Sequence, residues 1–489
     1  MIKAGDQVEH EEFGIGQVVA LLGTTVTVEF FGEKFDVDVG ELLPRPQGNT
    51  PVLASSAATV RQSGDLAFRQ SFEAVNLGVV PSDPNQLIKL TIGGDQISDE
   101  VRNILDYAPR RGACRIFMGY YGSGKSHHLK LVRAIALREG WVTASIELDP
   151  KAADPAKPFS VYQELITGLE FPMRNDGSRN EDFFDLIKEV RDNWMDVRAL
   201  KYFSASQWFR NGIEALQYLA HRRDDEEYVS AVNWLAGQVK LISAIRKVTW
   251  REGFRGKIPT MPQTKDTGLI YGFHLVVLNE VLKELGYRGL ALIIDEAEHV
   301  RTYSINRYLR ANNFFDVLAR CAHPPRKDLQ DPHCDYDMSG VPPFWRQGPH
   351  FGLFVGLTEG EDTQDLKRKA GEMSVLIHSP DEVVHLAPPS ASDYEAWATR
   401  FLTEASNHLG LKVDLLSDPD LCAKIAAVLK ERFQQVPDTD KLLRNWTKMA
   451  GLPAAVLLSH STPVGHNELL GIVDDAAKQI SGEVLPWDE

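Results

Sequence analysis

The chain has 489 residues, of which 43% are hydrophobic and 25% are charged, a composition typical of a globular protein with several domains. Its formal net charge of −15 argues against broad, charge-driven adhesion to DNA or to an anionic membrane, and leaves only a local basic strip open to nucleic acid. No apolar run approaches the roughly 20 residues of a membrane helix, no secretory signal is recognisable, and four cysteines indicate no disulfide framework. We therefore expect a cytoplasmic protein with no membrane partner.

Residues 1–46 predict a small antiparallel β-barrel. Short alternating runs at 17–21, 26–30 and 35–39 are separated by glycine-containing turns, which is the pattern of tightly connected strands. Residues 47–64 are rich in Gly, Pro, Ser, Ala and Thr, and this composition predicts a linker.

Beyond the linker, residues 65–386 predict a doubly wound α/β domain with a parallel sheet. Helical periodicity separates the strands, and we expect a helical insertion over about 150–268 and a C-terminal helical lid domain over 387–489. Near-continuous apolar runs, typical of parallel strands that helices cover on both faces, occur at Cys114–Met118, Val142–Leu148, Leu290–Ile294 and Phe351–Leu357.

Residues 119–126 match the phosphate-binding pattern G-x-x-x-x-G-K-[ST] at every fixed position. A predicted strand precedes them and a predicted amphipathic helix follows, so backbone N–H groups and the helix N-terminus would face a phosphate. We expect Lys125 to reach the β- and γ-phosphates and the Ser126 hydroxyl to coordinate Mg²⁺; the alternative is a chance glycine-rich turn. The predicted nucleotide-binding residues are Gly119, Tyr120, Tyr121, Gly122, Ser123, Gly124, Lys125, Ser126 and His127.

Two carboxylates follow the apolar strand predicted at Leu290–Ile294. Asp295 and Glu296 would lie at the carboxyl edge of the sheet, beside the phosphate-binding loop. We expect Asp295 to hold Mg²⁺ through its water shell and Glu296 to polarise the attacking water as a catalytic residue, with Lys125 as the catalytic cation. The alternative is a buried strand that ends in acidic helix-capping residues. ATP and Mg²⁺ are the predicted cofactors.

Several segments together resemble the ATP-binding proteins of bacterial BREX-type phage-defence clusters, the BrxD-like family of AAA-like P-loop ATPases. The resemblance covers roughly residues 65–450 and implies an ATPase that works beside a helicase-like protein encoded in the same cluster, with nucleic acid as one open substrate. The segments that carry it are Phe72–Pro81, Leu90–Gly93, Phe117–His127 and Ile293–Glu298.

The same resemblance bears on a threonine and on several arginines. In AAA-type ATPases a polar residue at the end of the strand that begins here at Phe351 senses the γ-phosphate, which makes Thr358 a candidate catalytic residue; a plain strand-end cap is the alternative. An arginine could serve as a finger on the ATP of a neighbouring copy in a homo-oligomer, or as a lid sensor. Solvated helix-face charge is favoured for any single one of Arg301, Arg307, Arg310, Arg320 and Arg444.

The segment 1–46 resembles the SH3/Tudor-like modules of transcription-repair factors and helicase tails, through Gly5–His10 and Phe13–Val19. Three basic residues stand against nine acidic ones in it, so a protein partner is favoured over a phosphate backbone. An inert, solubilising appendage is the alternative.

A basic segment at 240–265 has two interpretations of equal weight. Basic charge with Trp250 and Phe254 among it could grip single-stranded nucleic acid, or it could be the solvated end of a helix. The basic residues are Lys240, Arg246, Lys247, Arg251, Arg255, Lys257 and Lys265.

The sequence favours an ATPase of an anti-phage defence complex whose hydrolysis remodels or regulates a protein or nucleic-acid assembly. One alternative is an ATP-sensing switch with slow turnover, and the other is a DNA helicase or translocase. The helicase hypothesis is the weakest, because Asp295–His299 carries one residue more than a DEAH box and the other helicase motifs are not recognisable.

Overall fold

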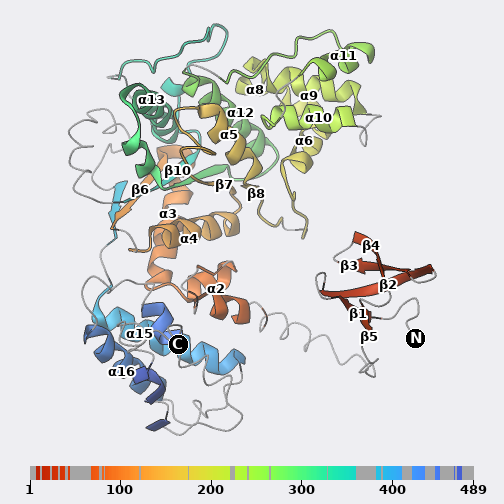
Figure 1. Ribbon diagram of the computed structural model, residues 1–489. Coiled ribbons are helices and arrows are strands. Elements are labelled where there is room, and N and C mark those ends of the chain that lie inside the picture. Colours follow the sequence, from red (N-terminus) through yellow and green to blue (C-terminus); the bar gives the residue numbers. More distant parts are fainter. Residues whose placement is uncertain are drawn as a thin grey trace. The chain divides into compact units, whose positions relative to one another are not determined.

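The computed structural model of the chain contains two compact units, Met1–Gly64 and Asp65–Glu489, both drawn in Figure 1. The predicted linker 47–64 lies outside the described residues, as do Tyr121, Gly122 and Arg444 among the predicted functional residues. The structure describes residues 7–10, 14–22, 25–30, 33–38, 42–44, 66, 68–75, 77, 80–81, 83–120, 123–174, 176–220, 226–238, 242–263, 266–325, 327, 329–358, 382–386, 389–409, 421–435, 446–451, 467–468 and 471–475.

The unit Met1–Gly64 contains a five-stranded antiparallel sheet with the order β4-β3-β2-β1-β5. The predicted runs at 17–21 and 26–30 fall within two of its strands, and the run at 35–39 overlaps a third. The likeness to SH3/Tudor-like modules stays a prediction. The strands are β1 (Gln7–His10), β2 (Gly14–Leu22), β3 (Thr25–Phe30), β4 (Glu33–Asp38) and β5 (Leu42–Pro44).

The unit Asp65–Glu489 is built on a six-stranded sheet with the order β11-β6-β10-β9-β7-β8. Every neighbouring pair is parallel except β7 and β8. All four predicted strands are confirmed, so the expectation of a mainly parallel α/β sheet holds. The strands are β6 (Ala113–Gly119), β7 (Val142–Glu147), β8 (Leu169–Glu170), β9 (Leu290–Asp295), β10 (Gly352–Thr358) and β11 (Val383–His385).

Helices cover both faces of this sheet because alternate residues of each strand point to opposite sides. In β6, Ile116 and Met118 join the large core that α12 and α13 also fill, whereas Phe117 joins a second core with α3 and α4. The covering helices are α2 (Pro84–Lys89), α3 (Gly94–Arg111), α4 (Lys125–Arg138), α12 (Gly268–Glu284) and α13 (Ile305–Ala322).

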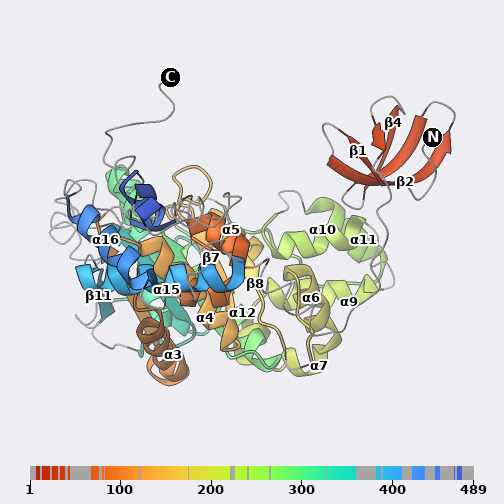
Figure 2. The ribbon, with the colours of Figure 1, turned by 90° about the horizontal axis from the view of Figure 1, so that it is seen from below.

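Short helices fill the chain between β7 and α12. Figure 2 shows α6, α9, α10 and α11 gathered beyond the β7–β8 edge of the sheet, and their buried residues belong to the same large core as the strands. The domain boundaries predicted for this region stay a prediction. The helices are α5 (Pro158–Thr167), α6 (Phe183–Asp192), α7 (Trp194–Val197), α8 (Lys201–Ala205), α9 (Phe209–Tyr218), α10 (Glu226–Leu235) and α11 (Ser243–Arg251).

A third core joins the beginning of this unit to its C-terminal helices α15 (Ala391–Leu409) and α16 (Leu421–Gln435). The ring of Phe72 stacks on Phe401 with centroids 5.4 Å apart, so segments far apart in the sequence share one apolar cluster. The structure also describes two 3₁₀ helices, η3 (Ala297–Thr302) and η4 (Phe344–Arg346). None of the described helices combines the length and apolarity that crossing a bilayer requires.

Candidate nucleotide site

The loop at 119–126 lies between β6, which ends at Gly119, and α4, which begins at Lys125. A Cβ on Gly119 would lie 2.4 Å from the Ser123 hydroxyl oxygen, so only glycine lets the loop close over the strand end. Gly124 has a φ of +93°, a left-handed conformation that favours glycine. The backbone therefore favours glycine at 124, and the close approach of the Ser123 side chain favours glycine at 119.

Lys125 points back into this loop. Its side chain is buried, and its ammonium lies 3.4 Å from the Gly119 carbonyl and 3.3 Å from the Tyr120 carbonyl. These are long hydrogen bonds for a buried cation, which is stabilised best by a charged partner. Ser126, the next residue, is exposed. The loop therefore offers a cation and a hydroxyl to an anion bound at the N-terminus of α4.

Asp295 ends β9, which is separated from β6 by β10. A Cβ on Gly356 of β10 would lie 2.5 Å from an Asp295 carboxylate oxygen and 2.9 Å from Leu129 of α4. The Asp295 side chain therefore crosses the bare backbone of β10 towards the helix that follows the phosphate-binding loop.

Glu296 has a φ of +57°, a left-handed backbone that no other described non-glycine residue adopts. Its backbone N–H donates to the Asp295 carboxylate at 2.9 Å. Left-handed conformations are costly for residues other than glycine and gather at functional sites. This conformation lies at the carboxyl edge of the sheet, directly after the last residue of β9.

Partial burial, together with the charges of Glu298 and Asp295, raises the pKa of Glu296, while His299 and Lys125 oppose this shift. The strand order β6-β10-β9 brings the end of β6, where the loop begins, and the end of β9, where the carboxylate pair lies, to one edge of the sheet. Excess negative charge at this edge favours a divalent cation.

The residues fit a magnesium ion that is shared with a nucleotide. Among the described residues no group of three or more His, Cys, Asp or Glu could hold a metal by itself. Mg²⁺ in nucleotide sites is usually held by one or two protein oxygens together with the phosphates, and Ser126 and Asp295 supply a hydroxyl and a carboxylate of this kind.

Thr358 ends β10 directly opposite Gly119 of β6. Its hydroxyl donates to one carboxylate oxygen of Glu298, and the other oxygen of Glu298 is buried without a hydrogen-bond partner among the described residues. Sequence reasoning noted Glu298 within the family resemblance and the likeness to a DEAH box, and gave it no role in the site. Its position on the turn after the carboxylate pair was the available sign that it belongs to the site.

His127 connects the first turn of α4 to the turn between α2 and α3. The Thr91 hydroxyl donates to the Leu87 carbonyl at 2.6 Å, so the Nε2–H of His127 donates to the Thr91 oxygen, also at 2.6 Å. Burial lowers the pKa of His127 to about 3, which keeps the imidazole neutral. The helix that follows the loop is thereby tied to residues more than 30 positions earlier.

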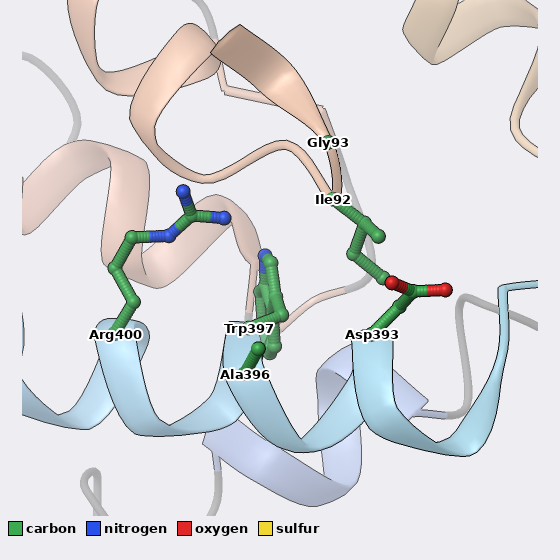
Figure 3. A pocket seen from close by; sticks show the side chains of 6 residues that line it. All are labelled: Ile92, Gly93, Asp393, Ala396, Trp397 and Arg400. Carbon is green, nitrogen blue, oxygen red and sulfur yellow. The ribbon is translucent and has the colours of Figure 1, made fainter. Parts of the chain in front are cut away.

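The same turn holds helix α15. Arg400 donates to the Thr91 carbonyl at 3.0 Å, and the Trp397 indole N–H donates to the Leu90 carbonyl at 2.6 Å. Beside these contacts lies a pocket of about 270 Å³, shown in Figure 3, into which the labelled side chains converge from both segments. Sequence reasoning missed it. The pocket is lined by Ile92, Gly93, Asp393, Ala396, Trp397 and Arg400.

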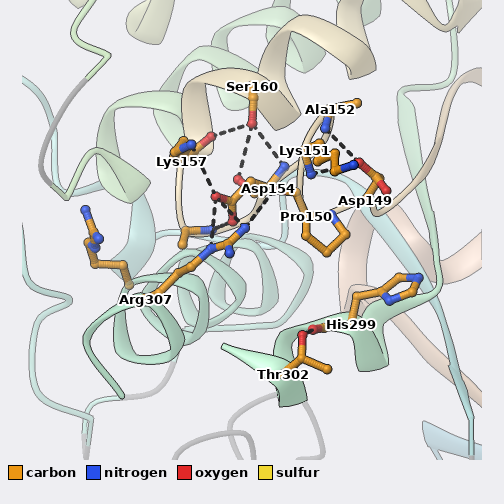
Figure 4. Close-up of polar contacts among 12 residues, drawn as sticks. Asp149, Pro150, Lys151, Ala152, Asp154, Lys157, Ser160, His299, Thr302 and Arg307 are labelled. Atoms are coloured by element: carbon orange, nitrogen blue, oxygen red, sulfur yellow. Dashed lines mark hydrogen bonds and ion pairs between the residues drawn. The ribbon is translucent and has the colours of Figure 1, made fainter. Parts of the chain in front are cut away.

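Two of the arginines proposed as fingers are bound within the chain. Arg307 pairs with the buried Asp154 at 3.0 Å and donates to the Pro150 carbonyl at 2.7 Å, as Figure 4 shows. Arg320 pairs with Asp316 at 2.8 Å. Arg307 therefore holds α13 to the loop after β7, and Arg320 pairs within α13 itself.

The other arginines are less constrained or are not described. Arg310 is half-buried and makes a single long contact, 3.4 Å, with the Asn306 carbonyl. The side chain of Arg301 and all of Arg444 lie outside the described residues.

A family model described as "BREX system ATP-binding protein BrxC/D" matches residues 67–196 and 181–350. The match extends over more than half of the chain, and it includes the loop at 119–126 and the carboxylates at 295–298. It stops before Thr358 and does not reach the sheet of the first unit. No curated protein matches the chain.

Proposed function

The chain belongs to the BREX system ATP-binding protein BrxC/D family, so it is an ATP-binding protein of a phage-defence system, and we propose that it is an ATPase that hydrolyses Mg²⁺-ATP. One observation carries the proposal. Only β10 separates β6 from β9, and a Cβ on Gly356 of β10 would contact both Asp295 and Leu129 of α4. This proximity of the loop that ends at Lys125 and the pair Asp295 and Glu296 supports hydrolysis, which requires a phosphate-binding cation and a base together.

In this proposal the backbone N–H groups of residues 119–126 hold the phosphates, with Tyr121, Gly122 and His127 in the loop and its first helical turn. Lys125 exchanges its two long carbonyl contacts for phosphate oxygens, which bind an ammonium more strongly. Ser126 and Asp295 hold Mg²⁺, which neutralises charge on the phosphates when it is bound.

Glu296 is the proposed base, since it carries the raised pKa at this edge and a base of higher pKa accepts a proton more readily. Thr358 is the proposed γ-phosphate sensor. Its hydroxyl is bonded to Glu298, so this contact must break before Thr358 can donate to a phosphate.

The pocket beside Trp397 is our proposed place for the nucleoside. It adjoins Thr91, which His127 contacts, so it lies within reach of a nucleotide whose phosphates occupy the loop. Asp393 and Arg400 supply an acceptor and a donor for the edge of a base. Binding there would bridge the sheet domain and α15, the first helix of the proposed lid over 387–489.

We further propose that hydrolysis remodels or regulates an assembly in the cytoplasm, together with a helicase-like protein of the same defence cluster. The acidic module at 1–46 would contact a protein partner. In a homo-oligomer, Arg310 is the described arginine best placed to serve a neighbouring copy, because Arg307 and Arg320 are ion-paired.

Replacing Glu296 by Gln tests the proposal, and Glu298→Gln is its matched control. We expect Glu296→Gln to bind ATP but to slow hydrolysis by about 100-fold or more, since general-base catalysis is worth that much, and to abolish phage protection. Glu298→Gln removes the same charge next to Thr358 and should slow hydrolysis far less. A wild-type protein that hydrolyses no ATP with magnesium contradicts the proposal; a Glu296→Gln variant that still protects cells favours the ATP-sensing switch.

A further inference from the structure

The helical segment beyond the β7–β8 edge carries a basic surface that the nucleotide site does not use. We call it the α11 strip and define it as Lys247, Trp250, Arg251, Arg255 and Lys257. It is part of the basic segment at 240–265, of which Lys240 and Lys265 lie outside the described residues. Helix α11 lies beside α9 and α10 at the outer side of this segment (Figures 1 and 2).

Helix α11 presents these residues on one side. Lys247, Trp250 and Arg251 stand at positions i, i+3 and i+4 and therefore share a face. All three are exposed, and Trp250 is 58% exposed. Ile245 and Val248 on the other face are buried in the large core. A packed helix thus holds the strip in a fixed orientation.

The chain folds back after α11 and places a cation on the exposed ring. Gly253 has a φ of +99°, which permits the reversal, and Phe254 anchors the turn in the core. The Arg255 guanidinium lies 4.1 Å from the centre of the Trp250 ring and also donates to the Trp250 carbonyl at 2.6 Å. This cation–π pair holds the indole in place, and Trp250 remains more than half exposed.

The cations of the strip lack carboxylate partners. Within the described part of the chain Lys247, Arg251, Arg255 and Lys257 form no ion pair, whereas the neighbouring Arg246 binds the Ile258 carbonyl at 2.9 and 2.7 Å. The chain as a whole carries a net charge of −15. Unpaired positive charge in an acidic protein is a local attraction for anions.

A solvated helix end explains only part of this arrangement. A cation in the last turn of a helix stabilises its dipole, which accounts for Arg251, and Arg255 caps the Trp250 carbonyl in that turn. Neither role requires the exposed indole of Trp250, nor Lys257, which lies beyond the turn. An acidic protein partner would use the cations but would not need a stacking ring.

We propose that the α11 strip binds single-stranded nucleic acid, with a base stacked on Trp250 and phosphates on Lys247, Arg251 and Lys257. Aromatic rings flanked by cations are the usual means of holding single strands, because an unpaired base exposes its face for stacking. A duplex hides those faces, so the strip should prefer single strands. This role adds a second ligand to the chain and does not depend on ATP hydrolysis.

Fluorescence anisotropy of the full chain with a labelled oligothymidylate of about 20 nucleotides tests the charge contribution. We expect the double variant Lys247→Glu and Lys257→Glu to bind at least about tenfold more weakly. The slope of log affinity against log salt concentration should become shallower by about 1.4, since each phosphate contact contributes roughly 0.7. The control is Arg110→Glu with Arg111→Glu, two exposed residues of α3 that change the net charge equally. Equal losses in both double variants would overturn the proposal.

Trp250 supplies the second test. Trp250→Ala should weaken binding about tenfold, while Trp250→Phe should retain most of the affinity, because stacking is worth roughly 1–3 kcal/mol per base. Oligouridylate binding would support the same chemistry and show that ribose is accepted. No binding by the wild type, equal binding of a matched duplex, or displacement by polyglutamate with no effect of Trp250→Ala would each refute it; the last would identify an acidic protein surface. Retained ATP binding verifies that each variant is folded.

Discussion

The phosphate end of the candidate site is made from residues at the ends of neighbouring strands, whereas the pocket beside Trp397 joins segments 307 positions apart in the sequence. The first needs only the order of strands, since β6, β10 and β9 place Gly119, Thr358 and Asp295 along one edge. The second needs the turn at Thr91 to hold α15 by hydrogen bonds. The phosphate end is therefore fixed by the sheet, and the pocket depends on how α15 is held.

The largest effect is expected of Lys125→Ala, which should abolish phosphate binding at the loop 119–126. Loss of the cation that we propose to contact two phosphates would remove charge-assisted hydrogen bonds worth about 1.5–3 kcal/mol each, so ATP affinity should fall by about 100-fold or more. Equilibrium binding of a fluorescent ATP analogue measures this. Lys130→Ala, an exposed lysine of the same helix, should bind normally, and unchanged binding by Lys125→Ala would refute the assignment.

Filling the pocket beside Trp397 should distinguish binding of the nucleoside from binding of the phosphates. Ala396 is exposed at the pocket wall, so Ala396→Trp should exclude a nucleoside without disturbing the core and weaken ATP binding by about tenfold, while inorganic tripolyphosphate competes as it does with the wild type. Ala391→Trp places the same ring on the same helix outside the pocket. If ATP binding survives in both variants, the nucleoside lies elsewhere.

Thr91 links the phosphate-binding loop to the pocket, since His127 of α4 and Arg400 of α15 both bond to it. Thr91→Val keeps the shape but leaves the buried His127 N–H without its acceptor, which costs about 1–3 kcal/mol. Thermal unfolding should show a lower melting temperature, with weaker ATP binding if the link positions α15. Thr399→Val is the control, because among the described residues the Thr399 hydroxyl bonds only to the Glu395 carbonyl of its own helix, at 2.9 Å. Equal shifts in both variants would mean that the link has no special role.

The positions of Gly119, Asp295 and Thr358 at strand ends could be predicted from the sequence because these residues follow local patterns. Near-continuous apolar runs indicated the four strands, and residues directly after a parallel strand must lie at its carboxyl edge. No such pattern reports a contact such as that of Trp397 with the Leu90 carbonyl, since side chains of distant segments share no periodicity. β8 has two residues and α7 has four, too few to show a period. The bond between Thr358 and Glu298 could not be predicted for the same reason, although each residue stands out in the sequence.

The smallest predicted effect concerns the charge at the carboxyl edge. The pKa of Glu296 is raised in the folded protein, so the folded state binds this proton more tightly than the unfolded state does. Its contribution to stability is therefore present at low pH and is lost as the pH rises through the raised pKa; the ionised side chain destabilises the nucleotide-free protein at neutral pH. Glu296→Gln removes this charge and should therefore raise the melting temperature at pH 7.5. The rise should be only about 1 °C, because water screens a partly exposed group. The difference should vanish below about pH 4, where the carboxyl is protonated in both states. A melting temperature that falls at pH 7.5 would show that the carboxylate stabilises the edge through Lys125, and that the two motifs are already paired before ATP binds.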